Sequence, residues 1–454
     1  MLTYQLNKQP GVPLYEALYR CIREDILSGQ LQPGDRLPSK RALAENLEVS
    51  KITVEGAYNQ LLAEGYIRSR EKIGYFVEAV TKQAAPLPET PPPEPNRDTC
   101  IDLTANTPAR FPFSVWSKLQ REVMLDLGEQ LLLALPNQGL WQLRQAIAGH
   151  LAQFRGMQVS PANILIGAGT DFLYNLLIQL LGRDKCYACE EPGYEKIRQI
   201  YAAGGVRCIS APMDAQGVLP EALENAQVLH ISPSHHYPTG IITPMHRRQA
   251  LLDWAGTSKW IIEDDYDSEF RFNARPMPTM QSLDKHGRVI YMNTFSKTLA
   301  PSIRISYIVL PEALMAQFQK NLGFYSCTVP SFEQHTLARF ISRGYFEKHL
   351  NRMRKFYKSR RNRVLEAIEQ SPLCSRLTIL EENAGLHFLV NVDTKLTDQE
   401  LLQRCQNAGI RIRALSDYLH QQAGDSHCLV VNYSGLTDDE LKKLESILKT
   451  IAIF

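Results

Sequence analysis

The sequence predicts a small, mainly helical domain followed by a larger α/β domain, and three observations support this organisation. Residues 1–79 place apolar side chains at helical spacing and end in a short β-rich tail. Residues 80–100 are rich in proline and lack apolar periodicity, as expected of an extended spacer. Residues 101–454 alternate helical runs with short β-rich runs, which indicates an α/β domain. A chain of 454 residues is also too long for one ordinary domain.

The composition narrows the class of protein. An apolar content of 44% and a charged content of 22% are typical of a chain that folds around a core. No apolar run reaches the ~20 residues needed to span a bilayer. Nine cysteines, with no signal-like segment before Pro10, indicate a reducing compartment. Cys186 and Cys189 have CxxC spacing, but no second pair completes a zinc site, so plain thiols are the preferred interpretation. We therefore expect a cytoplasmic protein with no membrane or metal partner.

Two short predicted helices in the first domain form a helix-turn-helix. They cover residues 40–47 and 51–64, and each follows a serine, Ser39 or Ser50, whose side chain can cap the helix. Apolar side chains at helical spacing predict another helix before them, which ends near Ser28. In such a motif the second of the two helices lies in the major groove of DNA.

A predicted β-hairpin completes the first domain. Residues 66–68 and 75–77 are expected to form two strands joined around residues 72–74, which is the pattern of a small wing. Residues 1–80 hold ten Lys and Arg against ten Asp and Glu, so the domain has no overall basic excess. Any positive face that binds DNA phosphates must therefore be local.

The run from residue 14 to residue 77 resembles the winged helix-turn-helix of the GntR family. The resemblance lies in an LPS-x-R-x-LA element, an S-x-x-TV element and the glycine-bearing wing. It implies that capped helix ends approach phosphates and that side chains early in the second helix reach base edges. The DNA contacts expected on this basis are Arg36, Ser39, Lys40, Arg41, Ser50, Lys51, Thr53 and Lys72. Lys51 stands where the family often has arginine, so a forked contact with guanine becomes a single-point contact. A solvated surface is the competing interpretation for each cation.

Three segments of the second domain carry groups that suit a phosphorylated ring. Residues 164–171 form a β-rich run that ends in glycines before a helical run, which exposes backbone N–H groups to an anion. Asp264 follows an apolar strand, where a carboxylate can keep a pyridine nitrogen protonated. Lys297 follows another such strand, and a lysine beside a buried pocket can lose its proton and form an imine. Arg304 can then supply a forked donor to a phosphate. An ordinary turn and a polar strand end compete with the first two interpretations.

Together these segments resemble the fold-type I, aspartate-aminotransferase-like family of pyridoxal-phosphate proteins over most of residues 101–454. The resemblance implies a mainly parallel sheet with helices on both faces, and pyridoxal 5'-phosphate as the cofactor. It also implies that Lys297 forms the internal aldimine, a Schiff base with the cofactor. Asp264 would pair with the pyridine nitrogen, Tyr266 would bond the ring hydroxyl, and Tyr194 would stack on the ring. The residues expected to hold the phosphate are Gly169, Thr170, Ser296 and Arg304.

The sequence departs from the aminotransferase pattern at two places. Tyr237 stands where the enzymes usually have an asparagine near the ring hydroxyl. Residues 385–387, Gly-Leu-His, occupy the region where the enzymes carry the arginine that grips a substrate α-carboxylate, so an amino acid loses its usual anchor. The candidate substitutes are Lys196, Arg411 and Arg413, for which surface charge is the competing account. His235 and His236 are adjacent in a segment expected to be extended, so they should face opposite sides and form no metal pair.

The whole arrangement resembles the MocR subfamily of GntR regulators, with a winged helix (1–79), a linker (80–100) and an aminotransferase-like effector and dimerisation domain (101–454). The resemblance implies a head-to-tail homodimer on double-stranded operator DNA with two half-sites. It further implies sensing of pyridoxal phosphate, or of an amine or amino acid, through Lys297. Two alternatives stay open. One is an active aminotransferase with a vestigial or oligomerising N-terminal module, and the other is a sensor of vitamin B6 supply that takes no amine.

Overall fold

The structure is a computed structural model that describes residues 4, 6, 13–80, 100–104, 110–272, 277–383, 385–420 and 424–450. The chain divides into two compact units, Met1–Arg97 and Asp98–Phe454, and each folds around its own core. Most of the spacer predicted over residues 80–100 lies outside the described residues.

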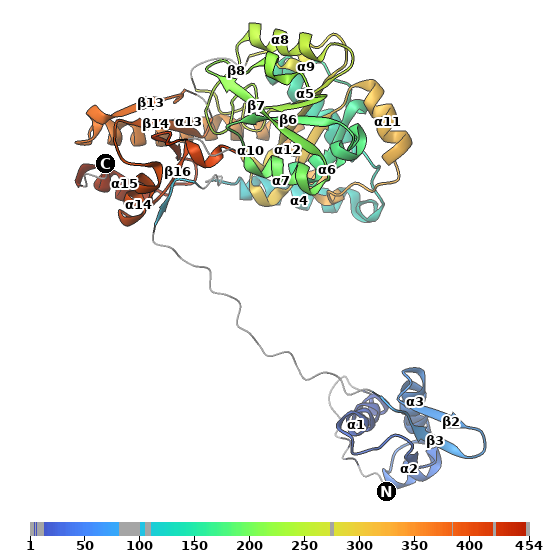
Figure 1. Cartoon of the computed structure of the whole chain (residues 1–454). Coiled ribbons are helices and arrows are strands. Elements are labelled where there is room, and N and C mark those ends of the chain that lie inside the picture. The colour runs from blue at the N-terminus through green and yellow to red at the C-terminus, as the bar shows by residue number, and fades with distance from the viewer. Residues whose placement is uncertain are drawn as a thin grey trace. The chain divides into compact units, whose positions relative to one another are not determined.

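The described residues of the small unit form three helices and a three-stranded sheet (Figure 1). The helices are α1 (Leu14–Ser28), α2 (Lys40–Asn46) and α3 (Lys51–Ala63), and the strands are β1 (Arg36–Leu37), β2 (Ile67–Arg70) and β3 (Gly74–Val77). Strand β3 lies between β1 and β2 and is antiparallel to both. The expected serine caps are present, because Ser39 and Ser50 accept hydrogen bonds from the backbone N–H groups of Ala42 and Thr53, each at 3.1 Å. Strand β1 is an addition to the hairpin that the sequence predicted.

An eight-stranded sheet forms the centre of the large unit, in the order β5-β12-β11-β10-β9-β6-β7-β8. The strands are β5 (Ile164–Gly167), β6 (Cys186–Glu191), β7 (Arg207–Asp214), β8 (Gly217–Val218), β9 (Val228–Ile231), β10 (Trp260–Asp264), β11 (Val289–Thr294) and β12 (Ser306–Val309). Strands β7, β6, β9, β10 and β11 are parallel, whereas β12 runs antiparallel to β11 and β5, and β8 runs antiparallel to β7. The expected mainly parallel α/β sheet is confirmed.

Helices cover both faces of this sheet (Figure 1). One face packs against α4 (Phe113–Leu127), α5 (Trp141–Arg155), α8 (Met245–Ala255), α9 (Met280–Leu283), α12 (Ser331–Ser342) and the start of α13 (Tyr345–Glu369). The other packs against α6 (Thr170–Leu181), α7 (Glu195–Ala203) and α11 (Glu312–Leu322). Side chains alternate accordingly: Ile164 and Ile166 of β5 join the first core, and Leu165 joins the second.

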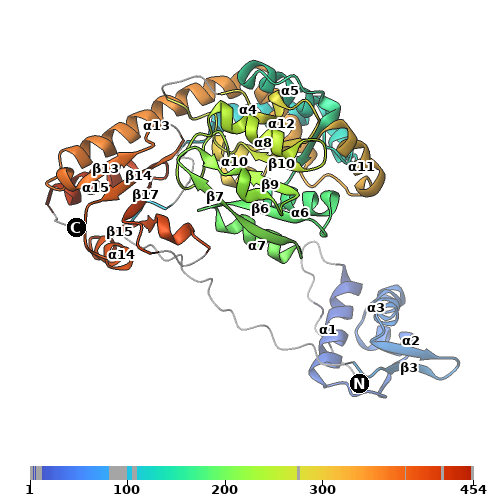
Figure 2. The ribbon, with the colours of Figure 1, turned by 45° about the horizontal axis from the view of Figure 1, so that its top comes forward.

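The C-terminal part of the large unit forms a smaller α/β layer, which α13 reaches from the helices beside the large sheet (Figure 2). Its sheet has the order β13 (Leu377–Leu380), β14 (His387–Val392), β17 (Cys428–Asn432) and β16 (Arg413–Ala414), and all its pairs are antiparallel. Strands β15 (Ile410–Arg411) and β4 (Ile101–Asp102) form a separate parallel pair. Helices α14 (Asp398–Asn407) and α15 (Asp438–Thr450) pack on this part.

Short helices complete the large unit. They are α10 (Phe295–Thr298) and the 3₁₀ helices Gly128–Leu132, Pro161–Asn163, Pro220–Leu223, Pro301–Ile303, Cys374–Arg376 and Leu415–Tyr418. Among the described residues, no helix is both long enough and apolar enough to cross a membrane.

Candidate functional site

A cavity of about 440 Å³ lies at the carboxyl ends of the central strands of the large sheet. Parallel sheets commonly bind ligands at this edge, because strand ends and helix N-termini meet there. The predicted residues that line the cavity are Thr170, Tyr194, Lys196, Asp264, Tyr266, Ser296, Lys297 and Arg304. The fold thus brings together residues from segments that are far apart in the sequence.

Lys297 lies in α10, directly after β11. Burial lowers the pKa of its ammonium group to about 8, and this effect exceeds the opposing influence of the Asp267 and Asp264 carboxylates. A fraction of the side chain is therefore the neutral amine near neutral pH. That form can attack a carbonyl carbon.

Asp264 ends β10 and is buried. Its Oδ2 atom accepts a hydrogen bond of 2.6 Å from the Tyr174 hydroxyl and lies 3.5 Å from Nε2 of His230. Its Oδ1 atom has no hydrogen-bond partner within the part of the chain that the structure describes. A buried carboxylate oxygen without a partner is costly. Asp264 is thus prepared to pair with a cationic group of a bound ligand.

The start of α6 forms an anion cradle on another wall of the cavity. Gly169 caps this helix with φ +88°, and a Cβ atom there would lie 2.1 Å from Nη2 of Arg304. The glycine therefore lets the guanidinium approach the backbone N–H groups at the start of the helix. Arg304 lies 3.6 Å from Asp171 in a half-exposed ion pair. Helix N–H groups beside a guanidinium suit a phosphate group.

Tyr266, which lines the cavity, contacts His235, one of two neighbouring buried histidines. The Tyr266 hydroxyl lies 3.4 Å from Nδ1 of His235, which is 2.9 Å from Oδ2 of Asp267. A Cβ at Gly385 would collide with the His235 ring at 1.8 Å, so the glycine there makes room for this ring. His387 is buried beside His235, with 4.7 Å between ring centroids. Burial lowers the pKa of His387, so its ring is neutral. It stands in the region where aminotransferases are expected to carry the arginine that binds a substrate α-carboxylate.

Tyrosine side chains form a second group. The Tyr237 hydroxyl is 2.7 Å from that of Tyr418, and the Tyr194 ring, which is about half exposed, makes an edge contact with the Tyr237 ring at 5.9 Å. Tyr237 thus supplies an aromatic wall in place of the usual amide side chain.

The three candidate carboxylate anchors lie in different surroundings. Lys196 lines the cavity, but its Nζ atom is 2.7 Å from Oδ2 of Asp171. Arg413 lies over the Tyr418 ring at 5.9 Å. Arg411 is exposed and lies 3.5 Å from Asp102. Of the three, only Lys196 is among the described residues that line the cavity.

His235 and His236 do not lie on an extended strand as predicted, because this segment is a turn after β9. Their side chains nevertheless have separate partners, since His236 contacts Thr239 at 2.7 Å and Glu190 at 3.4 Å. No group of three metal-ligating side chains occurs among the described residues.

Sequence reasoning missed the groups that hold Asp264. Tyr174 lies one turn into α6, and His230 lies in β9, the neighbour of β10 in the sheet. The buried Glu190, whose pKa burial raises to about 8, also lines the cavity. A histidine within the apolar run Val228–Ile231 was the available signal, but its partner could be found only from the strand order.

In the small unit, several predicted DNA contacts are tied to neighbours. Arg36 donates to the carbonyl of Ile73 in the wing at 2.5 Å. The ion pairs Lys40–Glu55 and Arg41–Glu45 measure 2.7 and 3.0 Å.

The start of α3 and the wing offer groups of a different kind. Thr53 is partly exposed, whereas Lys51 and Lys72 are exposed, and Lys72 has φ +61° at the tip of the wing. Sequence reasoning missed Ile52, which is 80% exposed beside Lys51 at the start of α3.

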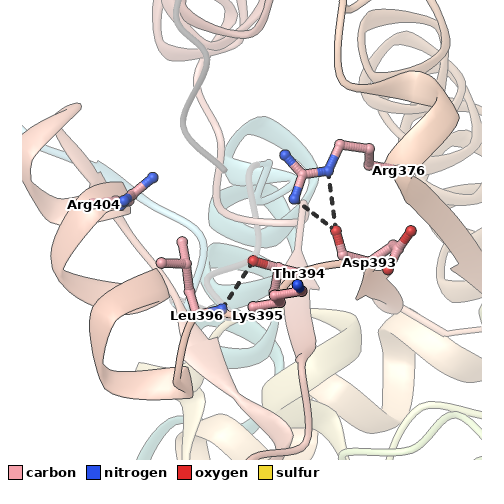
Figure 3. Close-up of a pocket in the computed structure, with 6 residues that line it drawn as sticks. All are labelled: Arg376, Asp393, Thr394, Lys395, Leu396 and Arg404. Carbon is pink, nitrogen blue, oxygen red and sulfur yellow. Dashed lines mark hydrogen bonds between the residues drawn. The ribbon is translucent and has the colours of Figure 1, made fainter.

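A second, open pocket of about 470 Å³ lies on the C-terminal part (Figure 3). Arg376 crosses it and donates from Nε and Nη2 to the carbonyl of Asp393, at 3.0 and 2.8 Å. Lys395 and Arg404 add exposed cations. This pocket lacks a buried reactive group among the described residues.

Comparison with known proteins agrees with both units. Residues 98–448 match the family "Aminotransferase class I and II", and residues 14–77 match "Bacterial regulatory proteins, gntR family". The chain is 36% identical over 452 residues to the HTH-type transcriptional regulator YdeL of Bacillus subtilis, and the match covers 97% of each protein. It is 34% identical to the probable rhizopine catabolism regulatory protein MocR of Rhizobium meliloti, covering 96% of this chain and 93% of that protein.

Among solved structures, an archaeal alanine:glyoxylate aminotransferase is similar, with a TM-score of 0.68 and 23% identity. The match covers 77% of this chain and 90% of the other, and it shows the fold of the large unit. The molecule is thus a transcriptional regulator with a DNA-binding winged helix and an aminotransferase-like domain. It belongs to the MocR subfamily of the GntR family.

Pyridoxal 5'-phosphate is the cofactor of this domain, as the sequence predicted. The cavity fits it, because the free oxygen of Asp264, the amine of Lys297 and the anion cradle at Gly169 match its ring nitrogen, aldehyde and phosphate. When bound, the cofactor supplies an electrophilic aldehyde and a ring that withdraws electrons.

Proposed function

We propose that this regulator senses pyridoxal phosphate, or an amine or amino acid that reaches it, through Lys297. The observation that carries the proposal is the partly buried amine of Lys297, whose pKa is lowered to about 8. It lies in a cavity of a chain that also contains a winged helix. A neutral amine beside an anion cradle can bind a phosphorylated aldehyde covalently and can pass it to an incoming amine.

In this proposal each group of residues around the cavity binds one part of the cofactor. Asp264 keeps the ring nitrogen protonated, while Tyr174 and His230 orient its carboxylate. Tyr266 hydrogen-bonds the ring hydroxyl, and Tyr194 covers the ring. The phosphate is held by Gly169, Thr170, Ser296 and Arg304.

The effector end of the cavity distinguishes this chain from an ordinary amino-acid enzyme. The buried, neutral His387 supports weak recognition of an α-carboxylate, because a neutral ring offers no forked cation. Lys196 is the candidate that we place against an effector carboxylate, and the substitutes are Arg411 and Arg413, which are not among the described residues that line the cavity. An effector carboxylate would pair with Lys196 only by competing with Asp171, which already pairs with it.

On the DNA side, we propose a head-to-tail homodimer in the cytoplasm that presents two winged helices to two half-sites. The helix start at Ser50, Lys51 and Thr53 would approach base edges, and the capped start of α2 would approach phosphates. Ligand binding changes regulation only if the ligand prefers one arrangement of the dimer over another.

The decisive experiment measures binding of the full-length protein to DNA from just upstream of its own gene, with the cofactor present and then removed. Binding that depends on the cofactor supports sensing of vitamin B6. Saturable DNA binding that is the same with and without the cofactor supports sensing of amines. Candidate amines are then titrated into the protein with the cofactor present. Absence of sequence-selective binding in both states, together with steady turnover of an amino donor and a 2-oxo acid, would overturn the proposal in favour of an aminotransferase.

A further inference from the structure

Two cysteines on neighbouring strands face each other beside the cofactor cavity. Cys189 lies on β6 and Cys208 on β7, and their Sγ atoms are 3.3 Å apart. The register pairs Tyr187 with Cys208 and Cys189 with Ser210, so the two cysteines are diagonal neighbours on the same face of the sheet. Cys186, the other member of the CxxC spacing, is three residues from Cys189 on one strand and thus faces the opposite side.

The two thiols differ in exposure and acidity. Cys189 is 5% exposed, whereas Cys208 is partly exposed. The hydrogen bond between the two sulfurs lowers the pKa of Cys208, helped by the Arg198 guanidinium and opposed by burial and the Glu191 and Glu195 carboxylates. The same hydrogen bond and burial raise the pKa of Cys189. The more acidic thiol is thus the partly exposed Cys208, and the less acidic thiol is the buried Cys189.

Arg198 fixes this arrangement. Its Nη2 atom donates to the Ser210 hydroxyl at 3.1 Å and to the carbonyl of Cys189 at 3.4 Å, and it also pairs with Glu191. The guanidinium therefore links β6 to β7 at the Cys189–Ser210 pair. A thiolate beside a cation, with a second thiol within reach, is the arrangement found in cysteines that sense oxidants.

We propose that Cys208 and Cys189 form an oxidation site that reacts with hydroperoxides and closes to a disulfide. The Cys208 thiolate attacks the terminal oxygen of the hydroperoxide, the O–O bond breaks, and the leaving oxygen takes a proton as an alcohol or water. Cys208 is then a sulfenic acid. The Cys189 sulfur attacks the Cys208 sulfur and loses its proton, the S–O bond breaks, and the hydroxyl leaves with that proton as water. The two thiols lose two electrons in total, and the hydroperoxide gains them.

The position of the site ties it to the cofactor cavity. Cys189 lines that cavity, as does the next residue, Glu190. Diagonal neighbours on a sheet have Cα atoms about 7–8 Å apart, at the upper limit of what a disulfide spans, so closing the sulfurs from 3.3 Å to about 2.05 Å requires the backbones of β6 and β7 to move beside the cavity.

The test uses the full-length, reduced protein with its cofactor. The protein is treated with hydrogen peroxide, the remaining thiols are alkylated, and the unreduced digest is mapped by mass spectrometry. We expect a linked peptide pair that contains Cys189 and Cys208, is lighter by two hydrogen atoms and is separated by dithiothreitol. Cys208→Ser should prevent the link, and Cys189→Ser should leave a Cys208 sulfenic acid that dimedone traps.

Cys186→Ser is the matched control, because it removes a buried thiol from the same strand, and it should leave the link intact. The exposed Cys374 serves as an internal reference for unselective oxidation. The proposal is overturned if Cys208 can still be alkylated after peroxide doses that already oxidise Cys374. It is also overturned if Cys189 is linked to Cys186 instead. Mapping of the wild-type protein alone decides between these outcomes, even if a variant does not fold.

Discussion

The two units of this chain build their sites in opposite ways. In the small unit, the expected DNA contacts come from one stretch, residues 36–72, and most of them lie exposed on the surface. In the large unit, the cofactor cavity gathers residues between Thr104 and Arg304 from several strand ends and partly buries them. Exposed charges act through water and are screened, whereas buried groups act at low dielectric. Substitutions should therefore have large effects in the cavity and modest, salt-dependent effects on the DNA-binding surface.

The largest expected effect is that of Lys297→Ala. We expect this variant to lose all of the absorbance that pyridoxal phosphate shows when linked to a lysine, with an unchanged far-ultraviolet circular dichroism spectrum. The winged helix should stay folded, because it lies in the other unit. Lys196→Ala is the matched control, since it removes an amine at the same cavity and should keep the absorbance. Retention of the absorbance in Lys297→Ala would remove Lys297 from its proposed role.

The second effect concerns pH. The cofactor-free protein should react with pyridoxal phosphate at a rate that falls about tenfold per pH unit below 8 and levels off above it, since only the neutral amine reacts. The folded pKa is below the ordinary value of 10.5, so the unfolded chain binds this proton more tightly. The cofactor-free protein should therefore gain stability as the pH rises from about 8 to 10.5.

Asp267→Asn provides a check on this assignment. Because the Asp267 carboxylate raises the pKa of Lys297, its neutralisation should move the midpoint of the rate profile below 8. A midpoint near 10.5 in the wild-type protein would show that Lys297 is not desolvated.

The third effect is that of Asp264→Asn, which removes the buried charge and keeps the shape. Cofactor affinity should weaken by about 2–5 kcal/mol, as is typical when one partner of a buried charge pair is truncated. Tyr174→Phe removes only the 2.6 Å hydrogen bond to this carboxylate and should cost about 1 kcal/mol. Equilibrium titration of the cofactor-free proteins measures both. Equal losses in the two variants would contradict the proposed pairing of Asp264 with the ring nitrogen.

The same contrast explains what the sequence could predict. The first residues of α2 and α3 could be predicted from Ser39 and Ser50, because a capping residue and its helix are neighbours in sequence. The closeness of Arg304 and Gly169 could not be predicted from their spacing, since 135 positions separate them. Only the resemblance to a known family placed both residues at the phosphate. The contact of His230 with Asp264 depends on β9 lying beside β10. The contact between Cys189 and Cys208 likewise depends on the register of β6 and β7, and the CxxC spacing gave no indication of it.

On the DNA-binding surface, Lys51→Ala should weaken binding to the operator by about 1 kcal/mol, the lower end of the range for a base contact. If Lys51 reaches a base edge, selectivity at one base pair should also relax. If it contacts only a phosphate, all sequences should lose affinity equally and the salt slope should fall by about one unit. Arg20→Ala is the control, because Arg20 is an exposed cation of the same unit that pairs with Glu16 on α1. Fluorescence anisotropy at several salt concentrations distinguishes these outcomes.

The smallest effect is expected at Ile52, which would make an apolar contact with DNA where its neighbours make charged ones. An isoleucine that is 80% exposed beside Lys51 contributes little to the core, so Ile52→Ala should leave the unfolding temperature unchanged. In the major groove, the apolar feature that it can contact is the thymine methyl group, and loss of this contact should cost about 0.8 kcal/mol, the value of one buried methylene. Deoxyuridine lacks that methyl group and keeps every hydrogen-bonding group of thymine. At one thymine of the operator, therefore, Ile52→Ala combined with deoxyuridine in place of thymine should weaken binding no more than either change alone. Additive losses at every thymine would contradict the contact and would leave the reading of bases to the polar side chains of α3.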